Sequence, residues 1–151
     1  MNLRKVMSPA TISVALKSDT KEGIIGELMD LLMAAGKIRD LKARKDALAV
    51  VLEREKKMST GMQNGIAIPH GKTDTVDSLV AAIGLKKEGV DFQALDGQPS
   101  RIFIMTLSPD TRTGPHIQFL AEISRQLSDA GTRERVLKAA TPEEVLDLLS
   151  G

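Results

Sequence analysis

The sequence predicts an α/β (α+β) protein in which a single mixed β-sheet is flanked by helices on both faces. Short apolar runs typical of strands are interspersed with longer segments in which apolar residues recur at helical spacing. The chain has 151 residues, of which 42% are hydrophobic, and this is the size and composition of one globular domain with one core. We therefore expect residues 1–151 to form a single domain without repeats or linkers.

The first part of the chain is expected to supply one strand and two helices. Residues 11–16 alternate between apolar and polar, which indicates a short strand. A first helix is expected to start near Asp19 or Thr20, with Asp19 and Glu22, three positions apart, as a candidate capping box. Asp40 is expected to cap a second helix that ends near Lys57. The side chains expected to face the core from this second helix are Leu41, Leu48, Val51 and Leu52.

The second part is expected to supply the central strands and three more helices. Residues 80–85 and 102–107 are nearly continuous apolar runs, as in strands buried on both faces. Pro115 suits the first position of a third helix, with Thr113 or the following glycine as its cap. The caps expected for two short C-terminal helices are Thr132 and Thr141.

The composition excludes several classes of function. The 21 basic and 20 acidic side chains give a net charge of +1 and are spread along the chain, so no basic stripe indicates nucleic-acid binding. The three Phe, with no Trp or Tyr, leave few aromatic platforms for base stacking. Without cysteine there can be no disulfide, thiolate zinc site or cysteine nucleophile. No run approaches the roughly 18 apolar residues that span a bilayer, so we expect no integral membrane segment and a cytoplasmic location.

The chain has two histidines, and each follows a proline. Pro69 restricts the backbone before His70 and Gly71 permits a turn after it, so His70 is expected on a stiff, exposed turn. Such a position suits a nucleophile that must meet a partner protein. The alternative is a surface histidine without a role, which is the more common case when Pro-His-Gly is considered alone.

The second histidine, His116, is expected in the first turn of the third helix. The unpaired N–H groups and the dipole of a helix N-terminus disfavour an imidazolium, whereas a neutral ring can donate a hydrogen bond to phosphate oxygens. His116 also lies on the apolar stripe of this helix. A partly buried core histidine is therefore the alternative.

The segment from Arg54 to Gly65 combines a cation at a helix end with hydroxyls and glycines, which are groups that steady a phosphate. The alternative is that its cations only solvate the helix end. Neither G-x-x-x-x-G-K-[ST] nor G-x-G-x-x-G occurs, so these nucleotide-binding loops are excluded. The candidate phosphate-binding residues besides Arg54 are Ser59, Thr60, Gly61, Asn64 and Gly65.

Together these motifs resemble the signature of the fructose/mannitol-type IIA family of the bacterial phosphotransferase system, which includes the nitrogen-regulatory IIA proteins. The resemblance extends over nearly the whole chain. Met62 and Gln63 stand where the family commonly has Ile-Gly, so the loop lacks one glycine. The matching residues are Arg54, Ser59-Thr60-Gly61, Asn64-Gly65, Ala67-Ile68-Pro69-His70-Gly71, the stretch 92–99 and Gly114-Pro115-His116.

The resemblance implies a phosphoryl carrier, with His70 as phosphoryl acceptor, His116 as its neighbour and Arg54 as the cation near the phosphate. The donor would be the phosphorylated HPr protein or a relative, and the acceptor a IIB component in sugar uptake. The alternative within the family is a nitrogen-regulatory protein, whose phosphorylation state controls partner binding without sugar transport. Neither role requires a cofactor, since transfer between imidazoles depends on positioning and charge stabilisation.

A metal-dependent hydrolase is the alternative outside the family. The two histidines are far apart in the sequence and show neither H-E-x-x-H nor H-x-H spacing. A metal site would therefore need carboxylate ligands to which no motif points. We expect no metal, and a metal-content measurement on the purified protein tests this.

Overall fold

The structure, a computed structural model, describes residues 1–110 and 113–151. Its helices are the 3₁₀ segments η1 (Leu3–Lys5) and η2 (Pro9–Thr11) and the α-helices α1 (Lys21–Ala34), α2 (Leu41–Lys57), α3 (Gly114–Leu127), α4 (Ala130–Lys138) and α5 (Pro142–Ser150). Its strands are β1 (Ile12–Ser13), β2 (Ile66–Ala67), β3 (His70–Lys72), β4 (Val80–Val90) and β5 (Ser100–Ser108).

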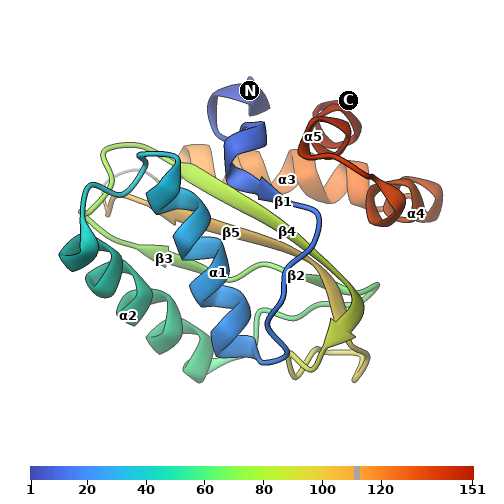
Figure 1. Cartoon of the computed structure of the whole chain (residues 1–151), viewed down its shortest axis with the longest axis horizontal. Coiled ribbons are helices and arrows are strands. Elements are labelled where there is room, and N and C mark those ends of the chain that lie inside the picture. The colour runs from blue at the N-terminus through green and yellow to red at the C-terminus, as the bar shows by residue number, and fades with distance from the viewer. Residues whose placement is uncertain (111–112) are drawn as a thin grey trace.

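A mixed sheet runs through the middle of the molecule (Figure 1). Its strand order is β1-β4-β5-β2, and β3 also pairs with β5. The central strands β4 and β5 are antiparallel, while β1, β2 and β3 are parallel to their neighbours. The strands β2 and β3 therefore follow one another along the same edge of β5. Between them Pro69 has no N–H to donate, but its carbonyl accepts a hydrogen bond from Thr106 N–H at 3.1 Å, which keeps the chain against β5.

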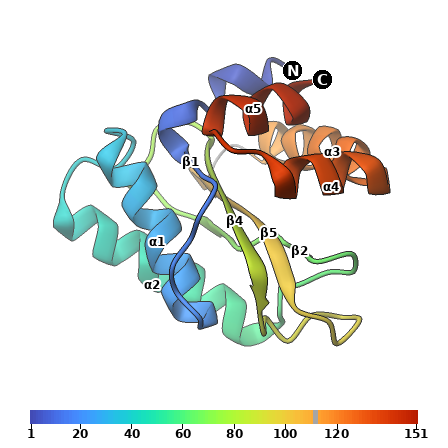
Figure 2. The ribbon, with the colours of Figure 1, turned by 45° about the vertical axis from the view of Figure 1, so that its right-hand side comes forward.

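Helices cover both faces of this sheet. Figure 2 shows α1 and α2 on one side and α3, α4 and α5 on the other. Each side has its own core: Leu28 and Phe103 belong to the core under α1 and α2, and Ile104 and Ile123 to the core under α3. Neighbouring residues of β5 enter different cores because successive side chains of a strand point to opposite faces. The predicted mixed sheet with helices on both faces is confirmed.

At the N-terminus of α1 the structure selects the second of the two predicted starts, Thr20. Thr20 is the cap, and its hydroxyl accepts a hydrogen bond from Gly23 N–H at 3.0 Å. Asp19 instead forms an ion pair with Lys86 Nζ of β4 at 3.1 Å. The predicted capping box of Asp19 and Glu22 is therefore wrong, because a lysine distant in sequence takes the carboxylate.

Two other predicted element ends also change. The strand expected at residues 11–16 is reduced to β1, because η2 takes Thr11 and the ladder with β4 ends at Ser13. The cap of α4 is Asp129, whose carboxylate accepts hydrogen bonds from both the N–H and the hydroxyl of Thr132, at 2.9 and 3.0 Å. Thr132 lies inside the first turn, so its predicted role as cap is wrong. The caps predicted for α2 and α5, Asp40 and Thr141, are confirmed.

The helix α2 packs through a face that differs partly from the predicted one. Leu41 was expected in the core but is 72% exposed. Two positions before Ala43, it lies about 200° around the helix from the packed face. The small Ala43 and Ala47 on that face allow a close approach to the rest of the fold. The buried residues of α2 are Ala43, Ala47, Val51 and Glu55.

Candidate active site

His70 begins β3 and lies opposite Thr106 of β5. Its Nδ1 atom lies 3.0 Å from the carbonyl oxygen of Ile68. A carbonyl can only accept, so Nδ1 carries the proton, and in the neutral ring Nε2 holds the lone pair. The prediction of an exposed turn is corrected to a half-buried strand position, because the extended backbone around Pro69 continues into pairing with β5.

His116 lies in the first turn of α3, as predicted, with Thr113 at the cap position. Its ring centroid is 5.4 Å from that of His70, and the two ring planes are inclined by 42°. Its Nε2 atom lies 2.9 Å from the hydroxyl oxygen of Thr106. The ring therefore meets His70 and the edge of β5, whereas the buried face of α3 is formed by Phe119, Ile123 and Leu127.

The surroundings of His116 lower its pKa below the ordinary histidine value of 6.5. Burial of the ring is the largest cause, because it disfavours the charged form. Electrostatic repulsion by His70 and Lys72 lowers the pKa further. These surroundings therefore favour the neutral form of His116 over the imidazolium.

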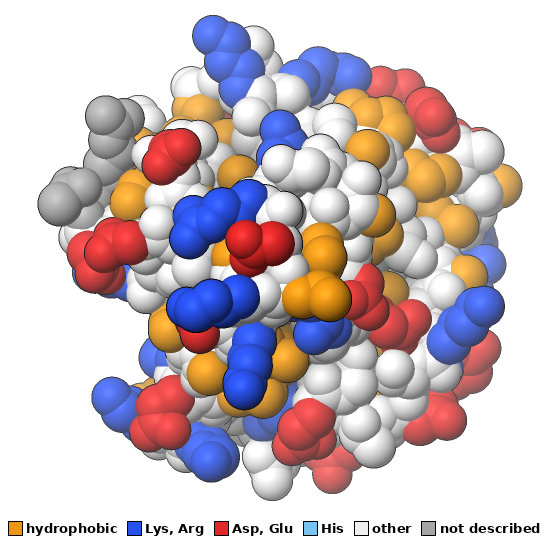
Figure 3. Space-filling model, turned by 60° about the vertical axis from the view of Figure 1, so that its left-hand side comes forward, with side chains coloured by type: hydrophobic (Ala, Val, Ile, Leu, Met, Phe, Trp, Pro, Cys, Tyr) orange, Lys and Arg blue, Asp and Glu red, His pale blue; other side chains and the backbone are white. Residues whose placement is uncertain are grey.

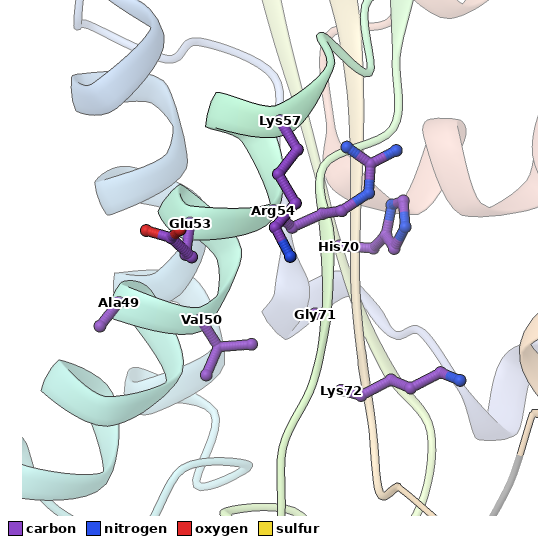
Figure 4. Close-up of a pocket in the computed structure, with 8 residues that line it drawn as sticks. All are labelled: Ala49, Val50, Glu53, Arg54, Lys57, His70, Gly71 and Lys72. Atoms are coloured by element: carbon purple, nitrogen blue, oxygen red, sulfur yellow. The ribbon is translucent and has the colours of Figure 1, made fainter.

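A cleft of ≈ 730 Å³ opens beside His70 between α2 and β3. Figure 4 shows Arg54 reaching from α2 toward the ring of His70. Its Nη1 atom donates a hydrogen bond to the carbonyl oxygen of Met58 at 2.7 Å, which holds the guanidinium near the end of α2. The lining contains more Lys and Arg than Asp and Glu, so it favours an anion. The lining residues are Ala49, Val50, Glu53, Arg54, Lys57, His70, Gly71 and Lys72.

The surface around α2 is mixed in charge. Figure 3 shows Lys and Arg side chains among Asp and Glu side chains on this face, with hydrophobic groups between them. The excess of cations in the cleft lining is thus a local feature beside His70. A localised anionic group suits it better than a long polyanion does.

Gly71 sets how closely α2 approaches His70. A Cβ at this position would lie 2.9 Å from Val50 Cγ1 and 3.1 Å from Val51 Cγ2. Carbon atoms in contact prefer about 3.5–4.0 Å, so only glycine lets α2 lie this close to β3. Because Arg54 follows Val50 by about one helical turn, this packing brings its guanidinium beside His70.

The first residues of the predicted phosphate loop are hydrogen-bonded within the protein. The hydroxyl of Thr60 donates to Glu55 Oε1 at 2.6 Å, and its N–H donates to Oε2 at 2.8 Å. The hydroxyl of Ser59 donates to the carbonyl of Phe92 at 2.5 Å and accepts from Gly61 N–H at 3.0 Å. These groups shape the chain that leads to His70.

Asn64 and Gly65 lie at the tip of a hairpin and are not brought to the histidines. Their φ angles are 65° and 73°, as in a tight two-residue turn. This turn forms without the glycine that the family commonly has at the position of Gln63. The carbonyl of Gly65 accepts from Arg101 N–H, whereas His70 pairs with Thr106, five residues further along β5 (101 to 106). At the rise of a strand this separation is about 16 Å. The interpretation of these two residues as phosphate ligands is therefore not supported by their position.

Two residues of the site were missed by sequence reasoning. Lys72 follows His70 by two positions in β3, so both side chains lie on one face of the strand. A strand prediction at His70 would have placed Lys72 on the same face as His70. Thr106 of β5 contacts His116 because the fold places the start of α3 beside this strand, a placement that no local pattern encodes.

This arrangement can hold a phosphoryl group at His70. His70 and the guanidinium of Arg54 line the cleft, and the ring of His116 lies beside that of His70. Within residues 1–110 and 113–151, no three His, Cys, Asp or Glu side chains gather as metal ligands would. Nor does any helix of the described chain have the length and apolar character that crossing a membrane requires.

The fold and these residues define a phosphotransferase IIA component. The family described as "Phosphoenolpyruvate-dependent sugar phosphotransferase system, EIIA 2" matches residues 5–151. The chain belongs to this family, as the motifs around His70 indicated.

Two relatives of this chain are fructose-specific components of the phosphotransferase system. The fructose-specific EIIA component of Haloferax volcanii is 40% identical over 92% of this chain and 88% of its own length. The fructose-specific EIIABC component of Bacillus subtilis is 34% identical over 99% of this chain. This chain spans 23% of the length of that larger relative.

Solved structures of the family share the fold. The nitrogen regulatory protein IIA-Ntr from Neisseria meningitidis superposes with a TM-score of 0.87 at 27% identity, covering 97% of this chain and 98% of that one. The enzyme IIA for mannitol from Escherichia coli, in complex with phosphorylated enzyme IIB, gives a TM-score of 0.80 at 26% identity. That comparison covers 96% of this chain and 97% of the other.

Proposed function

We propose that this chain accepts a phosphoryl group on Nε2 of His70 from an HPr-like phosphocarrier protein. It then passes the group to a IIB component for sugar uptake of the fructose/mannitol type. The observation that carries the proposal is the bond from Nδ1–H of His70 to the carbonyl of Ile68, which leaves Nε2 as the nucleophile beside Arg54. The fructose-specific relatives and the mannitol IIA–IIB complex support both the reaction and the partner.

The transfer balances without net proton movement at His70. The bond between phosphorus and the donor's nitrogen breaks while a bond forms from Nε2 of His70 to phosphorus. The proton on Nδ1 stays on its bond to Ile68 throughout. The product carries about two negative charges, which the guanidinium of Arg54 and a hydrogen bond from neutral His116 offset.

The remaining candidate residues have supporting roles in this proposal. Ser59, Thr60 and Gly61 give the chain before His70 its shape. Thr60 donates to Glu55, Ser59 donates to the carbonyl of Phe92, and Gly61 N–H donates to the hydroxyl of Ser59. The hairpin tip at Asn64 and Gly65 takes no direct part.

The direct test locates the phosphoryl group. The chain, labelled with ¹⁵N in its histidine rings, is incubated with phosphorylated HPr and examined by NMR for coupling between ³¹P and ¹⁵N. We expect coupling to Nε2 of His70. A label on Nδ1 of His70, a label on His116, or no label at all would contradict the proposal.

A regulatory role is the second candidate, favoured by the likeness to the nitrogen regulatory protein IIA-Ntr. In that role the phosphorylation state of His70 controls binding of a partner protein, and no sugar is transported. Adding candidate IIB proteins to the labelled chain separates the two. Transfer of label to IIB supports uptake, whereas a label that stays on His70 and changes partner binding supports regulation. Both roles place the chain in the cytoplasm, with its proposed donor.

A further inference from the structure

Thr106 connects the two histidines of the site. It pairs with His70 across β3 and β5, and its N–H donates to the carbonyl of Pro69 at 3.1 Å. Its hydroxyl oxygen lies 2.9 Å from Nε2 of His116. The residue is 1% exposed, so water does not compete for this hydroxyl. The buried side chain of Thr106 therefore holds His116 of α3 against strands β3 and β5, and β3 carries His70.

The chemistry of the two groups decides which of them donates. In the described part of the chain, the hydroxyl of Thr106 has no hydrogen-bond partner other than His116. If Nε2 of His116 carried the proton and donated, the hydroxyl proton of Thr106 would be buried without an acceptor, which is the costly arrangement for a donor. If Thr106 donates, its proton is satisfied and Nε2 accepts. The second arrangement also requires a neutral ring, and burial of His116, which lowers its pKa, favours that form.

We propose that Thr106 is a positioning residue that holds His116 as the tautomer protonated on Nδ1. Among the described residues Nδ1 has no hydrogen-bond partner. Its proton is therefore available to an oxygen of a phosphoryl group on His70. The ring centroid of His70 lies 5.4 Å from that of His116. This inference rests on the proposed function of His70 for the role of the Nδ1 proton, but the tautomer itself is a property of the unphosphorylated protein.

Loss of the Thr106 hydroxyl would release this control. A neutral histidine without a fixed partner can carry its proton on either nitrogen. With the proton on Nε2, Nδ1 would present a lone pair, which repels phosphoryl oxygens instead of donating to them. The hydroxyl thus decides whether His116 stabilises the phosphorylated state, without itself touching the phosphoryl group.

The tautomer is read directly by long-range ¹H–¹⁵N NMR of the histidine rings at a pH where His116 is neutral. In the wild-type protein we expect a protonated Nδ1 and an unprotonated Nε2 on His116. In Thr106→Val, which keeps the shape but removes the hydroxyl, a population protonated on Nε2 should appear. Thr106→Ser should keep the wild-type pattern. A wild-type His116 protonated on Nε2 overturns the proposal even if the valine variant fails to fold.

A matched control is available in Thr73, which is also buried and follows β3. Its hydroxyl donates to Thr75 Oγ1 at 3.1 Å and not to a histidine. Thr73→Val should leave the His116 tautomer and the transfer rate unchanged. A tautomer change in this control as large as that in Thr106→Val would show a general packing effect and overturn the specific role.

Phosphoryl transfer supplies the functional readout. Loss of one hydrogen-bond donor to the phosphoryl group should slow transfer from phosphorylated HPr about three- to tenfold in Thr106→Val. Thr106→Ser should restore the rate to within about twofold of wild type. An altered tautomer with an unchanged rate overturns the positioning role and leaves the proposed function intact. A wild-type protein that takes no label on His70 contradicts the proposed function itself, whatever the tautomer.

Discussion

The Nδ1 atom of His70 lies 3.0 Å from the carbonyl oxygen of Ile68, a residue only two positions earlier. Both groups belong to the same short segment, and Pro69 between them restricts the backbone that sets their distance. The tautomer of His70 is therefore determined locally. The groups proposed to stabilise its phosphorylated form, Arg54 and His116, come instead from two helices on opposite sides of the sheet.

Replacing His70 with alanine should abolish acid-labile phosphorylation by phosphorylated HPr, because the proposed nucleophile is removed. The fold should persist, since the side chain is half-buried at one end of a short edge strand. Radiolabelling before and after acid treatment measures the first outcome, and circular dichroism checks the second. Labelling at the wild-type rate would refute the assignment of His70.

Replacing His116 with alanine should leave His70 open to labelling but slow the transfer. The variant loses one hydrogen-bond donor to the phosphoryl group, which corresponds to about a tenfold effect on the rate of onward transfer. Rapid-quench kinetics with phosphorylated HPr and a IIB protein measure this. Unchanged kinetics would support the alternative, in which His116 is a partly buried core histidine without a role in transfer.

The pH dependence of stability should contain a contribution from His116. Because its pKa is lowered in the folded protein, the unfolded chain takes up the proton first as the pH falls below 6.5. The stabilisation by the neutral ring is complete above the unfolded pKa and is lost as the pH falls toward the folded one. Urea unfolding of wild type and His116→Gln across this range should show a flatter profile for the variant. Parallel profiles would contradict the lowered pKa.

Lys72 should contribute to that lowered pKa. Replacing Lys72 with Gln removes one of the positive charges that repel a proton from the ring, so the NMR titration midpoint of His116 should rise. Lys87 on β4 is exposed and is not among the causes of the shift, so Lys87→Gln provides the control. Equal shifts in both variants would show a general charge effect.

Replacing Gly71 with alanine should destabilise the protein and impair phosphorylation together. The added Cβ would lie 2.9 Å from Val50 Cγ1, and overpacking of this kind costs about 1–3 kcal/mol. Displacement of α2 would also move Arg54 away from His70. Denaturant unfolding measures the first effect and labelling kinetics the second. Gly114→Ala, where an added Cβ meets no atom within 4 Å, should change stability by less than about 0.5 kcal/mol.

Glu55 should be a principal stabilising residue of the chain before His70. Its carboxylate is nearly buried, pairs with Lys21 Nζ at 3.0 Å and accepts both donors of Thr60. Glu55→Ala removes one partner of a buried pair and should lower the free energy of unfolding by about 3–5 kcal/mol. The comparison is Asp46→Ala, which breaks the exposed pair with Lys42 and should cost less than about 0.5 kcal/mol. Similar losses of unfolding free energy in the two variants would show that the buried contacts of Glu55 stabilise the protein no more than an exposed ion pair does.

The sequence predicted most of the elements but not all of their ends. The apolar runs at residues 80–85 and 102–107 are buried strands because burial on both faces leaves a continuous apolar pattern. Which of Asp19 and Thr20 caps α1 could not be decided in the same way. The carboxylate candidate, Asp19, is taken by Lys86, a residue brought near only by the fold.

In the candidate site too, the features that are local in sequence could be predicted, and those that depend on the fold could not. Pro69, His70 and Gly71 are contiguous, so their motif could be recognised without any knowledge of the fold. The position of Asn64 and Gly65 does not support their interpretation as phosphate ligands, because residues close in sequence need not be close in space. An extended chain advances by about 3.3 Å per residue, so the hairpin tip with Asn64 and Gly65 lies far from His70.

By itself, the sequence determined the family, the mixed sheet and the segment around His70, since these depend on motifs and periodicities within short stretches. The tertiary structure alone decided what surrounds the ring of His70. The pairing of β3 with β5 places Thr106 opposite it, and the approach of α2 over Gly71 brings Arg54 beside it. Contacts between residues distant in the chain depend on register and packing distance, which no local pattern specifies.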